Sequence, residues 1–524
     1  MDNENSDYIP DNESFSDSTS TNDDSVVENK NIKNIMHFVK QINVNCTEDD
    51  FVEILEDMLE CIKEYINQEI VHLSSPDFYK TLVRDIAVIF YDYWLDANLC
   101  YDDEFDDIEE FVENVFDLYV DFYEFTPRSM KYDSLQPAFL KNDEMEELHL
   151  CTFKTPPSGA VMSEQGDADC ASHCAMCNGV KEKLEYLKQI PQPTQRTEEW
   201  YKYRHNLITA SNIWKALSSQ ANQNSLIYEK CKPLNANASA SAIKTNIESP
   251  LHWGVKYEPL SVLIYEEMFR TKIGDFGCIP HSTHNFIGAS PDGINIDETN
   301  RVLYGRMLEI KNICNRDITG IPKEEYWIQT QVQMETCDLD TCDFFETRFK
   351  EFASSELFYQ DSNHEYKGVI LHFIQKTNGY GIDVSNAQIY NNQPKYVYMP
   401  LTIEKTKDAI QEWISTVREG IKNDFTLYST IYWYLDEYSC VLIPRNRQWF
   451  AAALPKIREI WDTILKERVD GYEHRIAKKQ TPKQKIAVMN NLVTVENNLE
   501  SNTQIIHNMP TKKPVCLVKL DSCV

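Results

Sequence analysis

The sequence predicts an α/β protein, in which helices flank a mixed sheet, with an acidic all-α region in front of it. Segments rich in β-branched and aromatic residues alternate with segments of helical periodicity between residues 195 and 425, an order typical of helices packed on a sheet. Before residue 126, apolar residues recur at helical spacing in three stretches. The acidic residues are concentrated in the same N-terminal part, so the two parts differ in charge as well as in predicted structure.

The net charge of −32 is distributed unevenly along the 524 residues. Of the 83 acidic and 51 basic residues, residues 1–150 hold 38 and 9, a balance of −29, which leaves 45 and 42 for the remainder. The remainder is close to neutral, so the acidic total does not exclude a protein that acts on nucleic acid. No apolar run has transmembrane length, and the acidic N-terminus lacks the features of a signal peptide. With 15 cysteines, these features favour a reducing intracellular compartment over a disulfide framework.

The N-terminal part divides into a tail and a helical region. Residues 1–30 are rich in Asp, Asn and Ser, and we expect a disordered acidic tail. Residues 31–126 are predicted to form an acidic helical domain, because apolar residues recur at helical spacing near 51–66, 78–97 and 107–125. The domain could mimic DNA and cover a binding site, or it could be a solubilising or partner-binding module, which we favour.

Residues 127–194 are predicted to be a linker that carries a cysteine cluster. Cys170, Cys174 and Cys177, with Cys151 upstream, could hold zinc or an iron–sulfur cluster. The spacing lacks the paired Cys-x2-Cys of zinc sites, however, and a stretch containing Pro and Gly separates Cys151 from the others. We therefore favour free cysteines in a linker over a metal site.

Residues 195–425 are predicted to form the α/β domain. Helices open this segment, and the predicted strands and two later helices follow in the order 286–296, 302–310, 326–336 (helix), 343–349, 367–375, 395–400 and 403–421 (helix). Residues 426–470, which are rich in Tyr and Trp, are predicted to be a helical extension, and residues 471–524 a mobile C-terminal tail.

Two stretches in the middle of this domain contain the candidate catalytic residues. Residues 286–296 and 302–310 are separated by a polar turn cluster at 297–300, which predicts a β-hairpin. The first strand contains Asp292, within Ser-Pro-Asp-Gly, and the second contains Glu309. Folding of the hairpin would bring these two carboxylates side by side.

Glu309 and Lys311 lie two residues apart, and residues two apart on a strand share a face. With Asp292 they make a set of two carboxylates and one amine. Carboxylate oxygens suit Mg²⁺, which takes waters and phosphate oxygens as its other ligands. The set predicts metal-dependent hydrolysis of a phosphodiester, in which Lys311 orients a water or offsets negative charge. Taken alone, Glu309 and Lys311 are more often a solvated pair on an edge strand.

Five blocks in one order resemble the YqaJ-type viral recombinases, a family that includes the bacteriophage lambda exonuclease and is part of the PD-(D/E)xK nuclease superfamily. The blocks are 196–204 with 208–211, then Trp253-Gly254 with Glu258, then 288–293, 308–311 and Gln331-Val332-Gln333. The resemblance implies that the α/β domain has a PD-(D/E)xK restriction-endonuclease-like core.

The resemblance also implies a role for each matching residue. Asp292, Glu309 and the carbonyl of Ile310 would hold the metal ion, and Lys311 would be the catalytic lysine. Glu258 would bind a second metal ion or a water on the first.

Two positions of the match are less certain in the sequence itself. Gln331 would help to position the nucleophile, but Gln329, Gln331 and Gln333 alternate, so periodicity does not choose among them, and we favour Gln331 on the block match. Pro259 directly follows Glu258 and is expected to break or kink a helix there, which leaves the placing of Glu258 open.

Arg204 and Ser211 would bind the terminal 5′-phosphate of a DNA end. The residues agree with this implication, because Thr209 or Ser211 is a suitable N-cap for a helix through 213–217, and helix N-termini attract phosphate. Arg204 could add charge-assisted bonds. Without the resemblance, Ser211 could be only a cap and Arg204 a surface arginine.

The resemblance implies a Mg²⁺-dependent deoxyribonuclease, with Mn²⁺ as a substitute metal, which degrades linear double-stranded DNA from 5′ to 3′ in viral recombination, replication or repair. The alternatives are a structure-specific endonuclease and a non-catalytic DNA-binding module of the same fold. The implied partners are double-stranded DNA ends, a single-strand annealing protein and further copies of the chain, as a trimer, without a membrane. We expect the host cytoplasm or a viral factory as its location, and not secretion.

Overall fold

The computed structural model describes residues 48–96, 100–101, 104–123, 128, 179–193, 197–234, 249–376 and 394–476. The predicted tail at 1–30, the end of the chain from 477 and the cysteines of the predicted linker, Cys151, Cys170, Cys174 and Cys177, lie outside these residues. Within the described ranges, no helix has both the length and the apolar character that a bilayer span requires.

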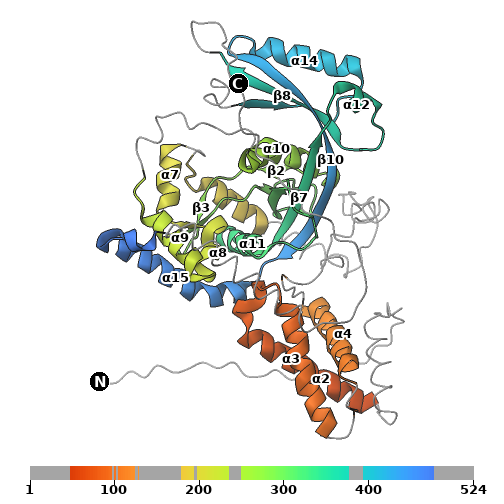
Figure 1. The fold of residues 1–524 in the computed structure, drawn as a ribbon, viewed down its shortest axis with the longest axis vertical. Coiled ribbons are helices and arrows are strands. Elements are labelled where there is room, and N and C mark those ends of the chain that lie inside the picture. Colours follow the sequence, from red (N-terminus) through yellow and green to blue (C-terminus); the bar gives the residue numbers. More distant parts are fainter. Residues whose placement is uncertain are drawn as a thin grey trace, which may run out of the picture.

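A seven-stranded mixed sheet forms the centre of the molecule, with the strand order β2-β5-β6-β7-β10-β8-β9 (Figure 1). Only β6 and β7 run parallel, and the other neighbours in this sheet are antiparallel. A smaller sheet has the order β1-β4-β3. The strands are β1 (Ile208–Thr209), β2 (Ile273–Gly274), β3 (Ile279–Pro280), β4 (Ile287–Ala289), β5 (Gly293–Asn295), β6 (Met307–Asn312), β7 (Thr341–Glu351), β8 (Lys367–Gln375), β9 (Lys395–Tyr398) and β10 (Phe425–Pro444).

Helices cover the sheet and form the N-terminal region (Figure 1). They are α2 (Glu48–Gln68), η1 (Ile70–Ser74), α3 (Phe78–Asp96), α4 (Phe105–Tyr123), α7 (Glu198–His205), α8 (Ala210–Leu217), α9 (Gln220–Cys231), α10 (Pro250–Phe269), α11 (Glu324–Cys337), α12 (Ser355–Gln360), α14 (Lys407–Ile421), α15 (Arg447–Asp470) and η4 (Glu473–Arg475). The predicted fold class, a mixed sheet flanked by helices with a helical N-terminal region, is confirmed.

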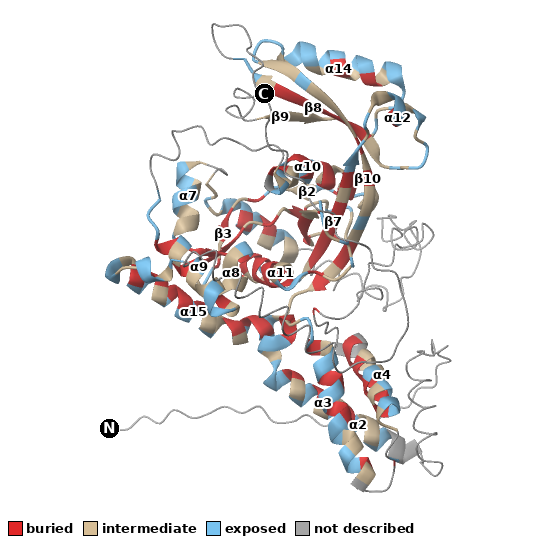
Figure 2. Cartoon of the chain, viewed as in Figure 1, coloured by how far each residue is buried: buried red, intermediate tan, exposed pale blue. Residues whose placement is uncertain are grey.

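Strand β6 separates an apolar face of the sheet from a polar one. Leu308 and Ile310 pack with Leu260 and Ile264 of α10 in one apolar cluster. Side chains alternate along a strand, so the residues between them project from the opposite face, where α11 lies. Figure 2 shows buried residues concentrated on β7, α10 and α11, in the middle of the molecule.

Residues 426–470 were predicted to be a helical extension, but most of the first half of this segment belongs to the 20-residue strand β10 (Phe425–Pro444). One edge of β10 pairs with β7, and its other edge pairs with β8. The segment is rich in Tyr, Thr and Ile, residues that fit a pleated, half-buried surface better than a helix. The predicted helix is present, but it is confined to α15.

The N-terminal helices α2, α3 and α4 share an apolar cluster with the α/β part of the chain. Arg128 connects the two parts, because its Nε donates to the carbonyl of Ser74 (2.6 Å) and its Nη1 to the carbonyl of Pro322 (2.8 Å). The hydroxyl of Ser74 also donates to Glu324 in the first turn of α11 (3.0 Å). The helical region is thus attached where the helix behind β6 begins.

Candidate active site

The predicted hairpin is present in a modified form. The first strand is divided into β4, in the small sheet, and β5, in the large one, with residues 290–292 between them. β5 pairs antiparallel with β6, and Gly293 lies opposite Leu308. The second strand begins at Met307, later than expected, because residues 301–305 form a turn in which Gly305 has a φ of +83°. The division of the first strand places Asp292 at the edge of β6.

Asp292 is bound to the backbone of β6. Its Oδ2 accepts a hydrogen bond from the N–H of Ile310 at 2.7 Å. The N–H and C=O of one residue in a strand point to the same side, so the carbonyl of Ile310 also faces Asp292. The predicted metal donors Asp292 and Ile310 are therefore neighbours.

Glu309 is fully buried and is held by three side chains (0% exposed). Its Oε1 accepts hydrogen bonds from Lys311 Nζ and, at 2.7 Å, from Gln329 Nε2. Its Oε2 accepts from Gln333 Nε2 at 2.8 Å. The Gln333 amide also donates to the carbonyl of Ser290 (3.1 Å), next to the Asp292 loop. The two carboxylates and the lysine named from the sequence are thus brought together.

Gln331 is not part of this set, which corrects the choice made on the block match. Its Nε2 donates to the carbonyl of Pro444 at 2.8 Å, and its Oε1 accepts from the N–H of Asn446 at 2.7 Å. Residues four apart on a helix share a face, whereas residues two apart point to nearly opposite sides. Gln329 and Gln333 therefore face Glu309 together, and Gln331 faces the junction of β10 and α15.

The charges in the site influence one another. Burial and the charge of Glu309 raise the pKa of Asp292 well above its usual value, against the opposing influence of Lys311 and the Ile310 N–H. Burial alone would lower the pKa of Lys311, but the charges of Glu309 and Asp292 raise it above its usual value. Lys311 therefore stays protonated, and the two carboxylates make the site one that a further cation would stabilise.

The residues present fit a hard divalent cation. Asp292, Glu309 and the Ile310 carbonyl offer oxygen donors, and Mg²⁺ can complete its shell with waters and phosphate oxygens. The buried Oε1 of Gln333 has no hydrogen-bond partner in the described part of the chain, so a water beside the cation could donate to it. No three His, Cys, Asp or Glu side chains in the described ranges lie close enough together to form a metal cluster by themselves.

Glu258 lies at the margin of the site. It is exposed on α10, and its charge contributes to the raised pKa of Asp292, after burial and Glu309. The expected break at Pro259 is not observed, because α10 continues through it to Phe269. The apolar face of α10 packs on the sheet through Leu260 and Ile264, which offsets the helix-breaking cost of about 3 kcal/mol for an internal proline.

Arg204 and Ser211 lie on either side of strand β1. Arg204 is in the last turn of α7, with its guanidinium 4.6 Å from the ring centre of Trp200. Thr209 is the N-cap of α8, and its Oγ1 lies 3.2 Å from the hydroxyl of Ser211 in the first turn. Ser211 is exposed and Arg204 is partly exposed. Both are accessible to a ligand at the start of α8.

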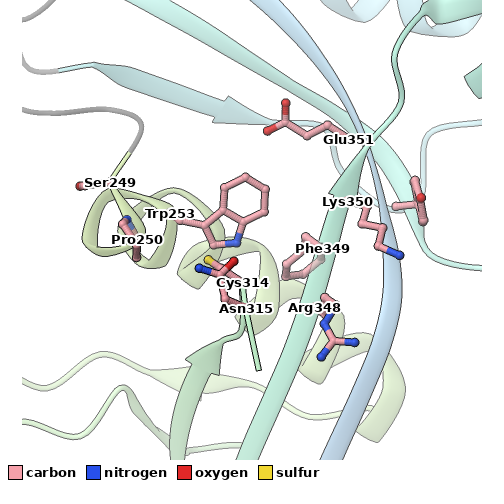
Figure 3. Close-up of a pocket in the computed structure, with 10 residues that line it drawn as sticks. Ser249, Pro250, Trp253, Cys314, Asn315, Arg348, Phe349, Lys350 and Glu351 are labelled. Atoms are coloured by element: carbon pink, nitrogen blue, oxygen red, sulfur yellow. The ribbon is translucent and has the colours of Figure 1, made fainter. Parts of the chain in front are cut away.

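A groove of about 540 Å³ lies beyond the end of β6 (Figure 3). Trp253 of α10 faces Cys314 and Asn315 across it, and Arg348 of β7 lies at its side. The charge of Arg348 is balanced by its pairing with Glu437. The groove therefore offers a ligand the aromatic surface of Trp253 and no unbalanced positive charge from Arg348.

Sequence reasoning missed two side chains around Lys311. Its Nζ lies 4.8 Å from the ring centre of Tyr326, and Arg316 lies near the same ring (5.8 Å). Arg316 is also paired with the buried Glu346, which is opposite Lys311 on β7. The sequence holds no signal for Arg316. Gln329 and Gln333, in contrast, could have been found from their four-residue spacing.

Comparison with known proteins gives one family and few relatives. Residues 199–340 match the YqaJ-like viral recombinase domain. An uncharacterised protein of Acanthamoeba polyphaga mimivirus is 29% identical over 311 residues, 54% of this chain and 54% of that protein, so the match spans about half of the relative's length.

Two solved structures of an alkaline exonuclease from Laribacter hongkongensis are also similar, one of them in complex with dAMP. Both are 18% identical with a TM-score of 0.29, over 52% of this chain and 94% of theirs. The resemblance inferred from the five sequence blocks is confirmed by the family model, which matches residues 199–340 as a YqaJ-like viral recombinase domain.

Proposed function

We propose that the protein is a Mg²⁺-dependent deoxyribonuclease that degrades linear double-stranded DNA from its 5′ ends. The observation that carries the proposal is the convergence of Asp292, at the edge of β6, with Glu309 and Lys311 on one face of that strand. The match of residues 199–340 to a viral recombinase domain, and the relative from a virus, support a role in viral recombination, replication or repair.

Asp292, Glu309 and the carbonyl of Ile310 would hold the ion. When bound, Mg²⁺ would polarise the scissile phosphate and lower the pKa of the attacking water, and Mn²⁺ would substitute for it. Lys311 stays protonated, orients the Glu309 carboxylate and offers positive charge to the phosphate. Gln329 and Gln333 fix Glu309, and the Oε1 of Gln333, which has no partner among the described residues, is available to accept a hydrogen bond from a water.

The DNA end would be recognised at the start of α8. Arg204 would bind the terminal 5′-phosphate through charge-assisted bonds, and Ser211 with the first N–H groups of α8 would complete the contact. Recognition of a phosphate at the end, rather than of bases, makes the activity independent of sequence. A trimer and a single-strand annealing partner remain predictions from the resemblance.

The test uses the full chain and end-labelled linear duplex DNA with Mg²⁺. We expect release of nucleotides from 5′-phosphorylated ends, slower release from 5′-hydroxyl ends, and no cutting of closed circles. Lys311→Met should abolish turnover while duplex binding is retained. Cutting of closed circles would favour a structure-specific endonuclease. Binding without cleavage in Mg²⁺ or Mn²⁺ would favour a non-catalytic DNA-binding module and refute the proposal.

A further inference from the structure

Two further cations, Lys230 and Arg468, lie next to Arg204 and the residues that follow it. Lys230 is in the last turn of α9 and is 5% exposed, and Arg468 is near the end of α15. In the described part of the chain, neither residue nor Arg204 forms an ion pair with a carboxylate. Burial is the main cause that lowers the pKa of Lys230, and the charges of Arg204 and Arg468 add to it. Against the opposing influence of Glu229, the pKa of Lys230 falls to about 8.

Both cations bind the backbone that connects α7 to β1. Lys230 Nζ donates to the carbonyl of Arg204 at 2.8 Å. Arg468 Nη2 donates to the carbonyl of His205 at 2.6 Å, and its Nη1 to Asn206 Oδ1 at 3.4 Å. The last carbonyls of a helix lack partners within the helix, and cations stabilise them. Arg204 and the two residues that follow it are thus held at three successive positions.

Arg468 also connects this backbone to α9. Its Nε donates to the carbonyl of Lys230 at 3.0 Å, and its guanidinium lies over the ring of Trp461 (5.4 Å). Helix α15 packs against α8 and α9 (Figure 1). Arg468, which lies outside residues 199–340, therefore fixes the end of α7 relative to the end of α9, and its helix α15 also packs on α8.

We propose that Lys230 and Arg468 are positioning residues of the 5′-phosphate site, which hold Arg204 and Ser211 in register for the DNA end. The inference rests on the proposed function. In the described part of the chain these three cations have no paired carboxylate, and they lie at the end of α7, from which strand β1 leads to α8. They suit an anion, because a phosphate bound by Arg204 and the first N–H groups of α8 would be attracted by the positive charge. Helix α15 is then a part of the end-recognition site.

The chain offers a matched control in Arg475. Like Arg468, it joins the C-terminal helices to α9, through Asn224 and Glu467, but it has no contact with residues 204–206. Arg475→Met should therefore remove a similar number of bonds without disturbing Arg204. Arg468→Met keeps much of the packing on Trp461 and removes the charge and the donors.

The experiment measures the ratio of initial degradation rates on 5′-phosphorylated and 5′-hydroxyl duplexes with the full chain and Mg²⁺. We expect Arg468→Met and Lys230→Met to lower this ratio by about tenfold, and Arg475→Met to leave it unchanged. Binding of both duplexes in EDTA, followed by fluorescence anisotropy, should lose the same preference. A general loss of structure would lower the rates on both ends and leave the ratio intact.

The outcomes separate the two proposals. If the unaltered protein degrades DNA without any preference for phosphorylated ends, the 5′-phosphate site fails and this inference fails with it. If the unaltered protein has the preference and folded Arg468→Met and Lys230→Met retain it, only the positioning role is overturned. Should Arg468→Met not fold, Arg468→Lys, which keeps the charge and loses the fork of donors, is expected to lower the ratio partly, and an unchanged ratio refutes the role.

Discussion

Replacing each glutamine of α11 in turn tests the geometry around Glu309. Gln329 and Gln333 donate to its two oxygens, whereas Gln331 bonds to the backbone at the junction of β10 and α15. Methionine is close to glutamine in length and is a good helix former, so Gln→Met removes the amide with little change in volume. The three variants form a matched series on one helix.

Gln329→Met and Gln333→Met should lower kcat/KM strongly. Each removes a hydrogen bond to a buried carboxylate, and a bond to a charged group contributes about 1.5–3 kcal/mol. At about 1.4 kcal/mol for each factor of ten, the expected loss is roughly 10- to 100-fold if Glu309 is used in the transition state. Gln333→Met should have the larger effect, because the Gln333 amide also holds the carbonyl of Ser290 beside Asp292.

Gln331→Met should act on stability instead. It removes two bonds to uncharged backbone groups, with an expected cost of about 2 kcal/mol in the free energy of unfolding. Denaturant unfolding measures this cost, and end-labelled linear duplex in Mg²⁺ measures kcat/KM, with Lys311→Met as the inactive reference. A folded Gln331→Met that loses activity as Lys311→Met does, beside active Gln329→Met and Gln333→Met, would refute the reasoning.

Two further substitutions test the support of the site. In Gly293→Ala the added Cβ would lie 2.1 Å from Cγ2 of Ile273, so β5 must shift, with an expected cost of about 1–3 kcal/mol and weaker Mg²⁺ binding, measured by thermal unfolding with and without the metal. Arg306→Met removes the cation paired with the buried Asp343 (3.2 Å) and should cost about 3–5 kcal/mol near neutral pH. Burial raises the pKa of Asp343, against the opposing charge of Arg306. The cost of Arg306→Met should therefore fall as the pH is lowered through this raised pKa, because Asp343 becomes protonated and neutral. Urea unfolding measures the cost, and a cost that does not change with pH would contradict this reasoning.

The residues of β6 could be placed from the sequence because the side-chain period of a strand is two. Leu308 and Ile310 had to face a core, which fixed Glu309 and Lys311 on the other side. The glutamines were expected on a helix over 326–336, as observed, but Gln331 was chosen among them on the block match. On a helix, four-residue spacing pairs Gln329 with Gln333 on one face and directs Gln331 elsewhere.

Strand β10 was misjudged because its length is unusual. Strands average about five to six residues, and a segment of 20 residues with Asp436 and Glu437 in its middle does not alternate regularly. The register with β7 shifts between Leu435 and Glu437, where an irregularity interrupts the pairing. The strand is stabilised by partners on both edges, which only the tertiary structure provides.

Contacts that join distant parts of the chain have no local signal. Arg468 reaches the turn after α7 across more than 260 residues, and Arg128 reaches Pro322 across 194. Their partners are backbone carbonyls, which every residue possesses. Composition and spacing therefore do not identify them, although they connect the candidate site to regions outside the matched domain.

The anchoring of the N-terminal helices changes how the DNA-mimic hypothesis is tested. Deletion of residues 1–150 would also remove Arg128 and Ser74, which bind Pro322 and Glu324 at the start of α11, the helix that holds Glu309. A change in activity after deletion would then not distinguish mimicry from lost support.

Neutralising the exposed acids Asp106, Asp107 and Glu110 of α4 leaves this anchor in place. A mimic that covers the DNA site predicts that Asp106→Asn, Asp107→Asn and Glu110→Gln together increase duplex affinity, with an effect that vanishes for a short phosphorylated end fragment too small to meet α4. A solubilising module predicts only a small, salt-screened increase for every DNA. We expect the second result in anisotropy titrations across ionic strengths, because the helices attach at the start of α11 and not over Lys311. A salt-resistant increase specific to long duplex would instead establish a cover.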